Sequence, residues 1–159
     1  MEMYYDRRIG MNNLYEYIDP ITSPYEAFFF DTDEDTFPIP VHWHYYAELL
    51  YILEGTVQFT IDNTVKTCLE GCAILFPPRC VHGINFFKRT ERIRYYVVKF
   101  DPGILPSYRT DDLNLRSSLY SISTAMYPCC FMSQEVSKME LRPLFEEIVK
   151  EYRAREYAY

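Results

Sequence analysis

The sequence predicts a mainly β protein, with its strands arranged as a sandwich or barrel, followed by one amphipathic helix. Residues 40–100 consist of short apolar stretches that follow one another closely, with turn residues between them, which is typical of sandwiches and barrels. Residues 141–152 carry apolar side chains at helical spacing instead. With 159 residues, 48% of them hydrophobic, the chain has the length of one domain and can bury a core without disulfides.

The N-terminal part of the chain divides into an arm and the start of the barrel. Residues 1–24 show no clear hydrophobic period and contain X-Pro turn residues, so we expect an irregular arm. The barrel is expected over residues 25–105, beginning with an aromatic strand at Tyr25–Phe30. The acidic run at residues 31–35 lacks the glycine and closing glutamate of a calcium loop, and we expect it to be a solvated turn.

Further strands are predicted along the rest of the barrel region. The alternation is clearest where Val57, Phe59 and Ile61 share one face. Gly, Pro, Asp and Asn residues between the stretches mark the turns. In chain order, the predicted strands are Val41–His44, Tyr46–Glu54, Thr56–Ile61, Thr64–Cys68, Cys72–Phe76, Val81–Phe87 and Arg92–Phe100.

Residues 106–159 are expected to form a linker and a C-terminal helix. Residues 106–132 are ambiguous, with at most one short helix. Apolar residues then recur on one helical face, at Leu141, Leu144, Phe145, Ile148, Val149 and Tyr152. Because Pro143 must lie in the first turn, the helix begins no earlier than about Met139. The apolar stripe is part of the core, a dimer seam, or both.

Charge and cysteine content narrow the possible partners and the compartment. The chain has 16 Lys and Arg against 23 Asp and Glu, a formal net charge of −7, which disfavours binding to nucleic acid unaided. No apolar run is long enough to span a membrane. The five cysteines are odd in number and the N-terminus does not resemble a signal peptide. We therefore expect reduced thiols, mostly in the core, and a cytoplasmic protein.

All three histidines of the chain lie in predicted strands, and a glutamate lies close to two of them. On a regular strand, His42, His44, Tyr46 and Glu48 share one face, and His82 can join them from another strand of a closed sheet. Three imidazoles and a carboxylate suit zinc, nickel, iron, manganese or copper. The same side chains can instead line a pocket and bind a ligand without a metal.

We therefore predict a ligand-binding site of five residues, four of which are also candidate metal ligands. The ligand-binding residues are His42, His44, Tyr46, Glu48 and His82. The candidate metal ligands, for Zn, Ni, Fe or Mn, are His42, His44, Glu48 and His82. No catalytic residue is predicted.

The spacing of these residues resembles the two motifs of the cupin superfamily, Gly-x5-His-x-His-x3/4-Glu-x6-Gly and Gly-x5-Pro-x-Gly-x2-His-x3-Asn. The matching positions are His42, His44, Glu48, Gly55, Gly71, Pro77 and His82. Other motif positions hold different residues, with Thr36 and Arg79 in place of glycines and Phe86 in place of the asparagine. The resemblance covers about residues 36–100 and implies a double-stranded β-helix, or jelly-roll barrel, with all four metal-ligand positions intact.

Within the cupins, the sequence looks most like the N-terminal sensor domain of arabinose-regulator (AraC-type) transcription factors. The residues that carry this likeness are Leu49, Tyr51, Leu53, Leu75, Pro78 and residues 94–102, together with the motif positions above. The resemblance implies an arm that folds over a small molecule in the barrel, a sugar or related metabolite, and a helix that mediates homodimerisation. It also implies that DNA is bound only through a helix-turn-helix domain, which is absent from this chain.

The resemblance implies a sensor rather than an enzyme. The alternative is a stand-alone metal-dependent cupin enzyme, such as a dioxygenase or isomerase, which the intact ligand positions favour.

Three further features have ordinary structural explanations. Trp43 and Tyr45 are expected to point away from the site. Arg79 is expected in a solvated turn, although it can reach an anionic ligand at the barrel mouth. Five basic residues within residues 88–99 are expected to belong to a solvated hairpin rather than a nucleic-acid surface.

Overall fold

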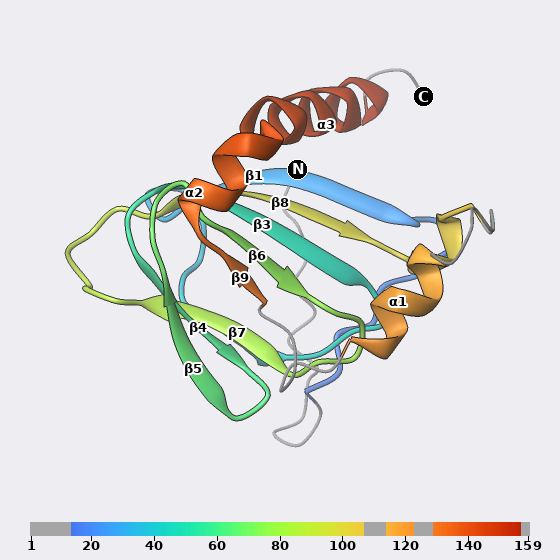
Figure 1. The fold of residues 1–159 in the computed structure, drawn as a ribbon, viewed down its shortest axis with the longest axis horizontal. Coiled ribbons are helices and arrows are strands. Elements are labelled where there is room, and N and C mark those ends of the chain that lie inside the picture. Colours follow the sequence, from blue (N-terminus) through green and yellow to red (C-terminus); the bar gives the residue numbers. More distant parts are fainter. Residues whose placement is uncertain (1–13, 107–113, 123–128, 157–159) are drawn as a thin grey trace.

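The computed structural model describes residues 14–106, 114–122 and 129–156, where the strands form two facing antiparallel sheets (Figure 1). The five-stranded sheet has the order β1-β8-β3-β6-β9, and the four-stranded sheet has the order β2-β7-β4-β5. The bounds in the first sheet are β1 Tyr25–Asp31, β8 Arg94–Phe100, β3 Ala47–Glu54, β6 Ala73–Phe76 and β9 Cys130–Phe131. In the second they are β2 Ile39–His42, β7 His82–Phe86, β4 Val57–Ile61 and β5 Thr64–Cys68. The predicted mainly β fold with a barrel is confirmed.

The core lies between the two sheets, because alternate residues of each strand face inward. On β4, Val57, Phe59 and Ile61 are buried, as the alternation predicts. On β8, Tyr95 and Val97 face the same interior. The largest core side chains also include Leu50, Ile52, Ile74, Phe76 and Ile93. These aromatic and branched side chains fill the interior of the barrel.

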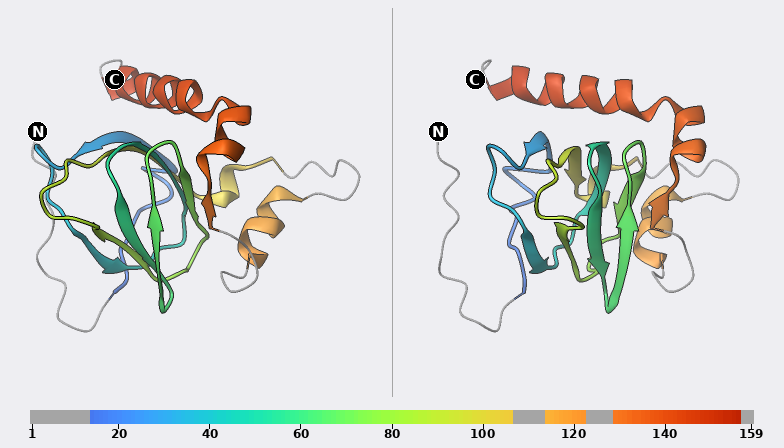
Figure 2. Two further views of the ribbon diagram at one scale, coloured as in Figure 1. Left: turned by 60° about the vertical axis from the view of Figure 1, so that its left-hand side comes forward. Right: turned by 90° about the vertical axis from the view of Figure 1, so that its left-hand side faces the viewer.

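The C-terminal helix α3 (Leu141–Glu156) lies against the outer face of the five-stranded sheet (Figure 2). The ring of Phe145 packs 5.9 Å from Tyr51 and 6.4 Å from Tyr96, measured between centroids. The predicted helix is therefore confirmed, and Phe145 and Val149 of its apolar stripe are buried. Leu144 differs from them, because half of its surface is exposed.

Shorter helices connect the barrel to α3. They are η1 Pro102–Ile104, α1 Leu115–Ser121, α2 Ser133–Val136 and η2 Ser137–Met139. Asn114 caps α1 by accepting a hydrogen bond from Ser117 N. The sequence allowed at most one short helix within residues 106–132, and α1 is the helix that the structure describes there.

The segment expected to be a linker also contains a strand of the barrel. β9 pairs with the edge of β6, with Ala73 opposite Phe131 and Ile74 opposite Cys130. The barrel therefore includes residues beyond 105, the limit expected from the sequence. A strand of two residues shows no hydrophobic alternation, so residue patterns alone do not reveal it.

The regular strand assumed through residues 42–48 is absent. β2 ends at His42 in the four-stranded sheet, and β3 begins at Ala47 in the five-stranded sheet. Residues 43–46 therefore cross from one sheet to the other. A closed barrel needs such crossings, which interrupt the two-residue alternation that the prediction used.

Two charged residues of the runs 31–35 and 88–99 are buried rather than solvated. Asp31 is only 3% exposed and accepts hydrogen bonds from Arg92, with Nη2 at 2.5 Å from Oδ2. Arg94 pairs with Glu54 on β3. Lys99, near the end of β8, is only 8% exposed. The expectation of solvated turns is therefore wrong for Asp31 and Lys99, because each is buried beside a group of opposite charge.

Cys68, Cys72, Cys80 and Cys129 are buried and Cys130 is partly buried, all as free thiols. Cys68 Sγ on β5 lies 3.1 Å from Cys130 Sγ on β9.

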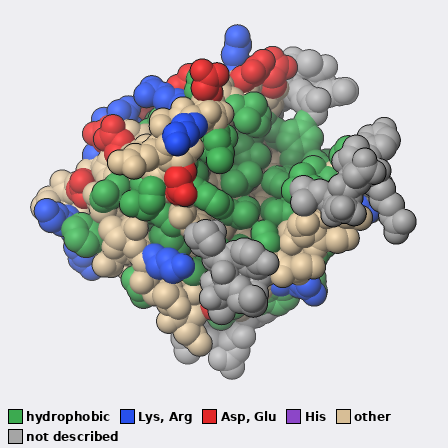
Figure 3. All heavy atoms as spheres, viewed as in Figure 1, with side chains coloured by type: hydrophobic (Ala, Val, Ile, Leu, Met, Phe, Trp, Pro, Cys, Tyr) green, Lys and Arg blue, Asp and Glu red, His purple; other side chains and the backbone are tan. Residues whose placement is uncertain are grey.

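A groove on the outside of the molecule lies between α3 and the sheet, lined by Phe29, Tyr96 and Val149 with charged residues of α3. Hydrophobic side chains gather on the face between α3 and α1 (Figure 3).

Candidate metal and ligand site

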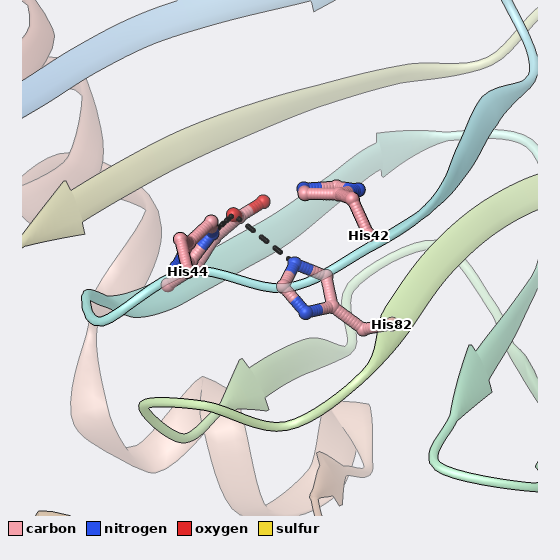
Figure 4. A group of neighbouring side chains, drawn as sticks. His42, His44 and His82 are labelled. Atoms are coloured by element: carbon pink, nitrogen blue, oxygen red, sulfur yellow. Dashed lines mark hydrogen bonds and ion pairs between the residues drawn. The ribbon is translucent and has the colours of Figure 1, made fainter. Parts of the chain in front are cut away.

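The four predicted metal ligands come from four different segments of the barrel. His42 on β2 lies directly opposite His82 on β7 in the strand register. His44 belongs to the crossing between the sheets, and Glu48 lies on β3. Their candidate ligand atoms all lie within 4.8 Å of one another. The three rings face a common centre (Figure 4).

This centre is buried at its base and partly open at His42. Glu48 Oε2 lies 3.0 Å from His44 Nε2 and 3.5 Å from His82 Nε2. The side chains of His44 and His82 are each 1% exposed, whereas that of His42 is 18% exposed. Phe76 stacks on His82 with a centroid distance of 4.3 Å. The centre is therefore more open on the side of His42 than at His44 or His82.

Backbone carbonyl groups orient all three imidazole rings in the same way. Nδ1 lies 2.8 Å from Pro40 O in His42, 3.1 Å from Tyr46 O in His44 and 3.1 Å from Cys80 O in His82. Because a carbonyl oxygen only accepts, Nδ1 carries the proton in each ring and donates it. In a neutral ring, Nε2 then presents its lone pair to the centre. Metal-binding histidines are oriented by such bonds from their second nitrogen.

The residues present fit a divalent transition metal. His82 Nε2 is buried and has no hydrogen-bond partner in the described part of the chain, which is costly unless something binds it. Burial also lowers the pKa of His82 despite the neighbouring Glu48, and this favours the neutral ring that a metal requires. Three imidazole nitrogens and one carboxylate could therefore hold a zinc, nickel, iron or manganese ion.

Lys99 is a residue of this centre that the sequence analysis missed. Its Nζ lies 3.7 Å from Glu48 Oε2. Burial opposes ionisation of both groups, but their mutual attraction outweighs it, so the pKa of Lys99 is raised and that of Glu48 lies well below its usual range. The alternation of β8 could have revealed Lys99, because Tyr95, Val97 and Lys99 share the inward face.

Glu16, from the N-terminal arm, is the second residue that was missed. Its Oε2 lies 3.4 Å from His42 Nε2, 3.9 Å from His44 Nε2 and 3.3 Å from Lys99 Nζ. Burial alone would raise the pKa of Glu16, but a hydrogen bond from the protonated ring of His42 and the charge of Lys99 lower it to about 2. The arm has no periodic pattern, so no residue pattern identifies Glu16.

The arm is fastened to the crossing segment beside the site. Glu16 N donates to Trp43 O at 2.9 Å, and Trp43 N donates to Leu14 O at 2.8 Å. The ring of Tyr15 packs 4.6 Å from Trp43. Trp43 and Tyr45, which were expected to point away from the site, both contact Tyr15 of the arm. Residues 1–13 of the predicted arm lie outside the described residues.

Tyr46, the fifth predicted site residue, lies beside the centre. Its ring is 6.3 Å from that of His44, and its hydroxyl donates to Ser23 O of the arm at 2.6 Å. Burial raises the pKa of Tyr46 to about 12.

Arg79 has a left-handed backbone with φ of 68°, and its N donates to His44 O at 2.7 Å. This conformation explains why the cupin motif has a glycine there.

Comparison with known families agrees with the fold. The family model of the AraC-like ligand binding domain matches residues 24–158. The chain belongs to this family. The AraC-like domain thus includes both sheets, the histidine centre and α3. None of the curated protein sequences compared with it matches.

Three solved structures similar to this AraC-like domain are described as cupins. The cupin domain of Schizosaccharomyces pombe Cnp3 is 16% identical over 50% of this chain and 57% of its own, with a TM-score of 0.45. A cupin 2 conserved barrel domain protein from Salinispora arenicola is 20% identical over 50% and 65%, with a TM-score of 0.41. An RmlC-like cupin from Shewanella frigidimarina is 19% identical over 57% and 72%, with a TM-score of 0.43.

The chain thus spans less than two thirds of the first two of these proteins. Among the helices that the structure describes, none is long and apolar enough to cross a membrane.

Proposed function

We propose that this chain is the effector-sensing and dimerisation domain of an AraC-type transcription regulator. Its effector is a small molecule that binds at the histidine centre, and DNA is bound through a separate helix-turn-helix domain. The position of Glu16 is the observation that most supports sensing. This residue of the arm occupies the place where a ligand would enter. Ligand binding and the position of the arm are therefore linked, and a ligand shifts the population of arm states.

We also propose that the centre holds one first-row divalent ion. When bound, the ion would supply a positive charge and open coordination positions for a ligand. His42, His44 and His82 would hold it through Nε2, Glu48 through its carboxylate, and the carbonyl groups behind the rings would keep them oriented. Phe76 and the core beneath it exclude water from the far side.

Metal analysis of protein purified without a nickel column tests this ion. The wild type should contain about one equivalent of metal per chain, whereas the His42→Ala/His44→Ala double variant should contain almost none. Glu48→Gln should weaken binding, whereas Glu54→Gln, on the same strand but paired with Arg94, should not. Equal and negligible metal in the wild type and the double variant would refute the metal site.

Dimerisation is proposed to use the exposed side of α3. Leu144 is half exposed, although Phe145 beside it is buried against the sheet. Sedimentation at micromolar concentration should show a dimer of the wild type, and the Leu144→Glu/Ile148→Glu variant should be monomeric. Leu144→Glu alone should weaken the dimer without disturbing the packing of α3, and Glu147→Lys serves as the exposed control. A monomeric wild type would reject this part of the proposal.

A second candidate function is a stand-alone metal-dependent cupin enzyme, such as a dioxygenase or isomerase. The complete set of three histidines and one glutamate favours it. The reading frame after the codon for Tyr159 separates the two functions. A helix-turn-helix downstream supports the regulator, and a stop codon supports the enzyme.

A further inference from the structure

Glu16 places a carboxylate of the chain itself between Lys99 and the histidines. It comes from outside both sheets, yet its carboxylate lies 3.3 Å from Lys99 Nζ. Lys99 is nearly buried, so its ammonium group depends on nearby anions for stabilisation. Glu16 therefore indicates that the position beside Lys99 accepts a carboxylate.

The position can be vacated without disturbing the barrel. The side chain of Glu16 remains 32% exposed, and Leu14 before it is half exposed. The arm is joined to the crossing segment by backbone bonds to Trp43 and by the Tyr15 ring. A segment with so little buried surface can open locally while both sheets stay folded.

We propose that the effector is a small carboxylate, which replaces Glu16 beside Lys99 and thereby releases the arm. Exchange of one carboxylate for another leaves the charge of the site unchanged, so Lys99 keeps the same number of anionic partners. A neutral ligand that displaced Glu16 would leave the buried ammonium with one partner fewer, which costs free energy. This inference rests on the proposed sensing function and specifies its ligand class.

Trp43 reports on the arm, because it is the only tryptophan of the chain and Tyr15 packs against it. Its fluorescence should be followed while the wild type is titrated with acetate, butyrate or succinate. Acetamide, butyramide and succinamide are the neutral counterparts, and chloride keeps the ionic strength constant. The carboxylates should change Trp43 emission in a saturable way, whereas the amides should have no effect.

Glu16→Gln removes the competing carboxylate, so the same acids should bind at roughly tenfold lower concentration. Asp19→Asn makes the same chemical change elsewhere on the arm, where Asp19 caps a turn, and should titrate like the wild type. Thermal unfolding is the second readout, because it reports binding even if Glu16→Gln already releases the arm. The acids should raise the Tm of this variant more than that of the wild type.

Equal responses to acids and amides, or no saturable response to any acid in either protein, would overturn the ligand class. A neutral metabolite that stabilises the wild type while the acids do not would also overturn it, yet would leave the sensing function intact. The two proposals therefore fail separately.

Discussion

Lys99 allows two carboxylates to remain ionised in an almost closed space, and its removal should be costly. Lys99→Met leaves Glu48 and Glu16 without their shared cation. We expect the free energy of unfolding to fall by about 3–5 kcal/mol, as for other buried ion pairs that lose one partner. Urea denaturation measures the loss, with Lys66→Met on the exposed strand β5 as the control.

Adding Glu16→Gln to Lys99→Met should recover part of this loss, because it removes one of the two stranded charges. Destabilisation equal to that of Lys66→Met would show that Lys99 does not stabilise the centre.

The two motif glycines should respond differently to the same substitution. Both have positive φ, 84° at Gly55 and 78° at Gly71. A Cβ at Gly55 would lie 2.4 Å from Arg92 O, whereas the nearest described atom to one at Gly71 would be Ser133 Cβ at 3.2 Å. Gly71→Ala should cost about 1 kcal/mol for the backbone conformation, and Gly55→Ala clearly more. Equal losses in denaturant unfolding would contradict this steric explanation.

Residue patterns predicted those parts of the site that depend on local spacing. His42, His44 and Glu48 lie close in sequence, and His82 joins them through strand pairing. Lys99 could have been placed by alternation along β8, but it was grouped with the nearby basic residues instead. Glu16 could not have been predicted, because its contact with Lys99 depends on how an irregular arm folds across the barrel.

At the scale of elements, α3 is fixed to the barrel by one side and exposed on the other. Phe145→Ala removes the contacts with Tyr51 and Tyr96 and should destabilise the domain by about 3 kcal/mol. Leu144→Ala, one residue earlier, should change stability by less than about 1 kcal/mol. Thermal unfolding of the two variants at the same protein concentration measures the difference. Similar losses would show that α3 is held in another way.

The predictability of the elements follows their length and regularity. α3 and β4 each carry a full period of apolar residues, and both were predicted from that period. β9 has two residues, which is too short for any period. It forms because the edge of β6 offers unpaired backbone groups that the returning chain can satisfy.

For the whole molecule, the ion pair between Asp31 and Arg92 should contribute to acid sensitivity. Hydrogen bonds from Arg92 lower the pKa of Asp31 although burial opposes this. A lowered pKa gives stability that is complete above the unfolded value, about 3.9, and is lost as pH falls through the folded value. Wild type should therefore exceed Asp31→Asn in stability at neutral pH, and the gap should close below about pH 4.

Urea denaturation between neutral and strongly acidic pH measures this gap, and Glu34→Gln in the same loop is the control. A gap that is independent of pH would mean that the charge of Asp31 does not matter.

The two thiols at the junction of β5 and β9 give the fold a latent cross-link. Cys68 and Cys130 are 62 positions apart in sequence, yet their sulfur atoms lie 3.1 Å apart. Oxidised glutathione should convert them to a disulfide while it is reduced to two thiols, and mass spectrometry should show the loss of two hydrogens. Cys130→Ser should not react in this way.

A bridge over so long a loop would restrict the unfolded chain and add about 4 kcal/mol of stability if the native geometry accommodates it. Oxidation would then tie the four-stranded sheet to the strand that leads into α3, and the covalent connectivity of the barrel would depend on the redox state of its surroundings.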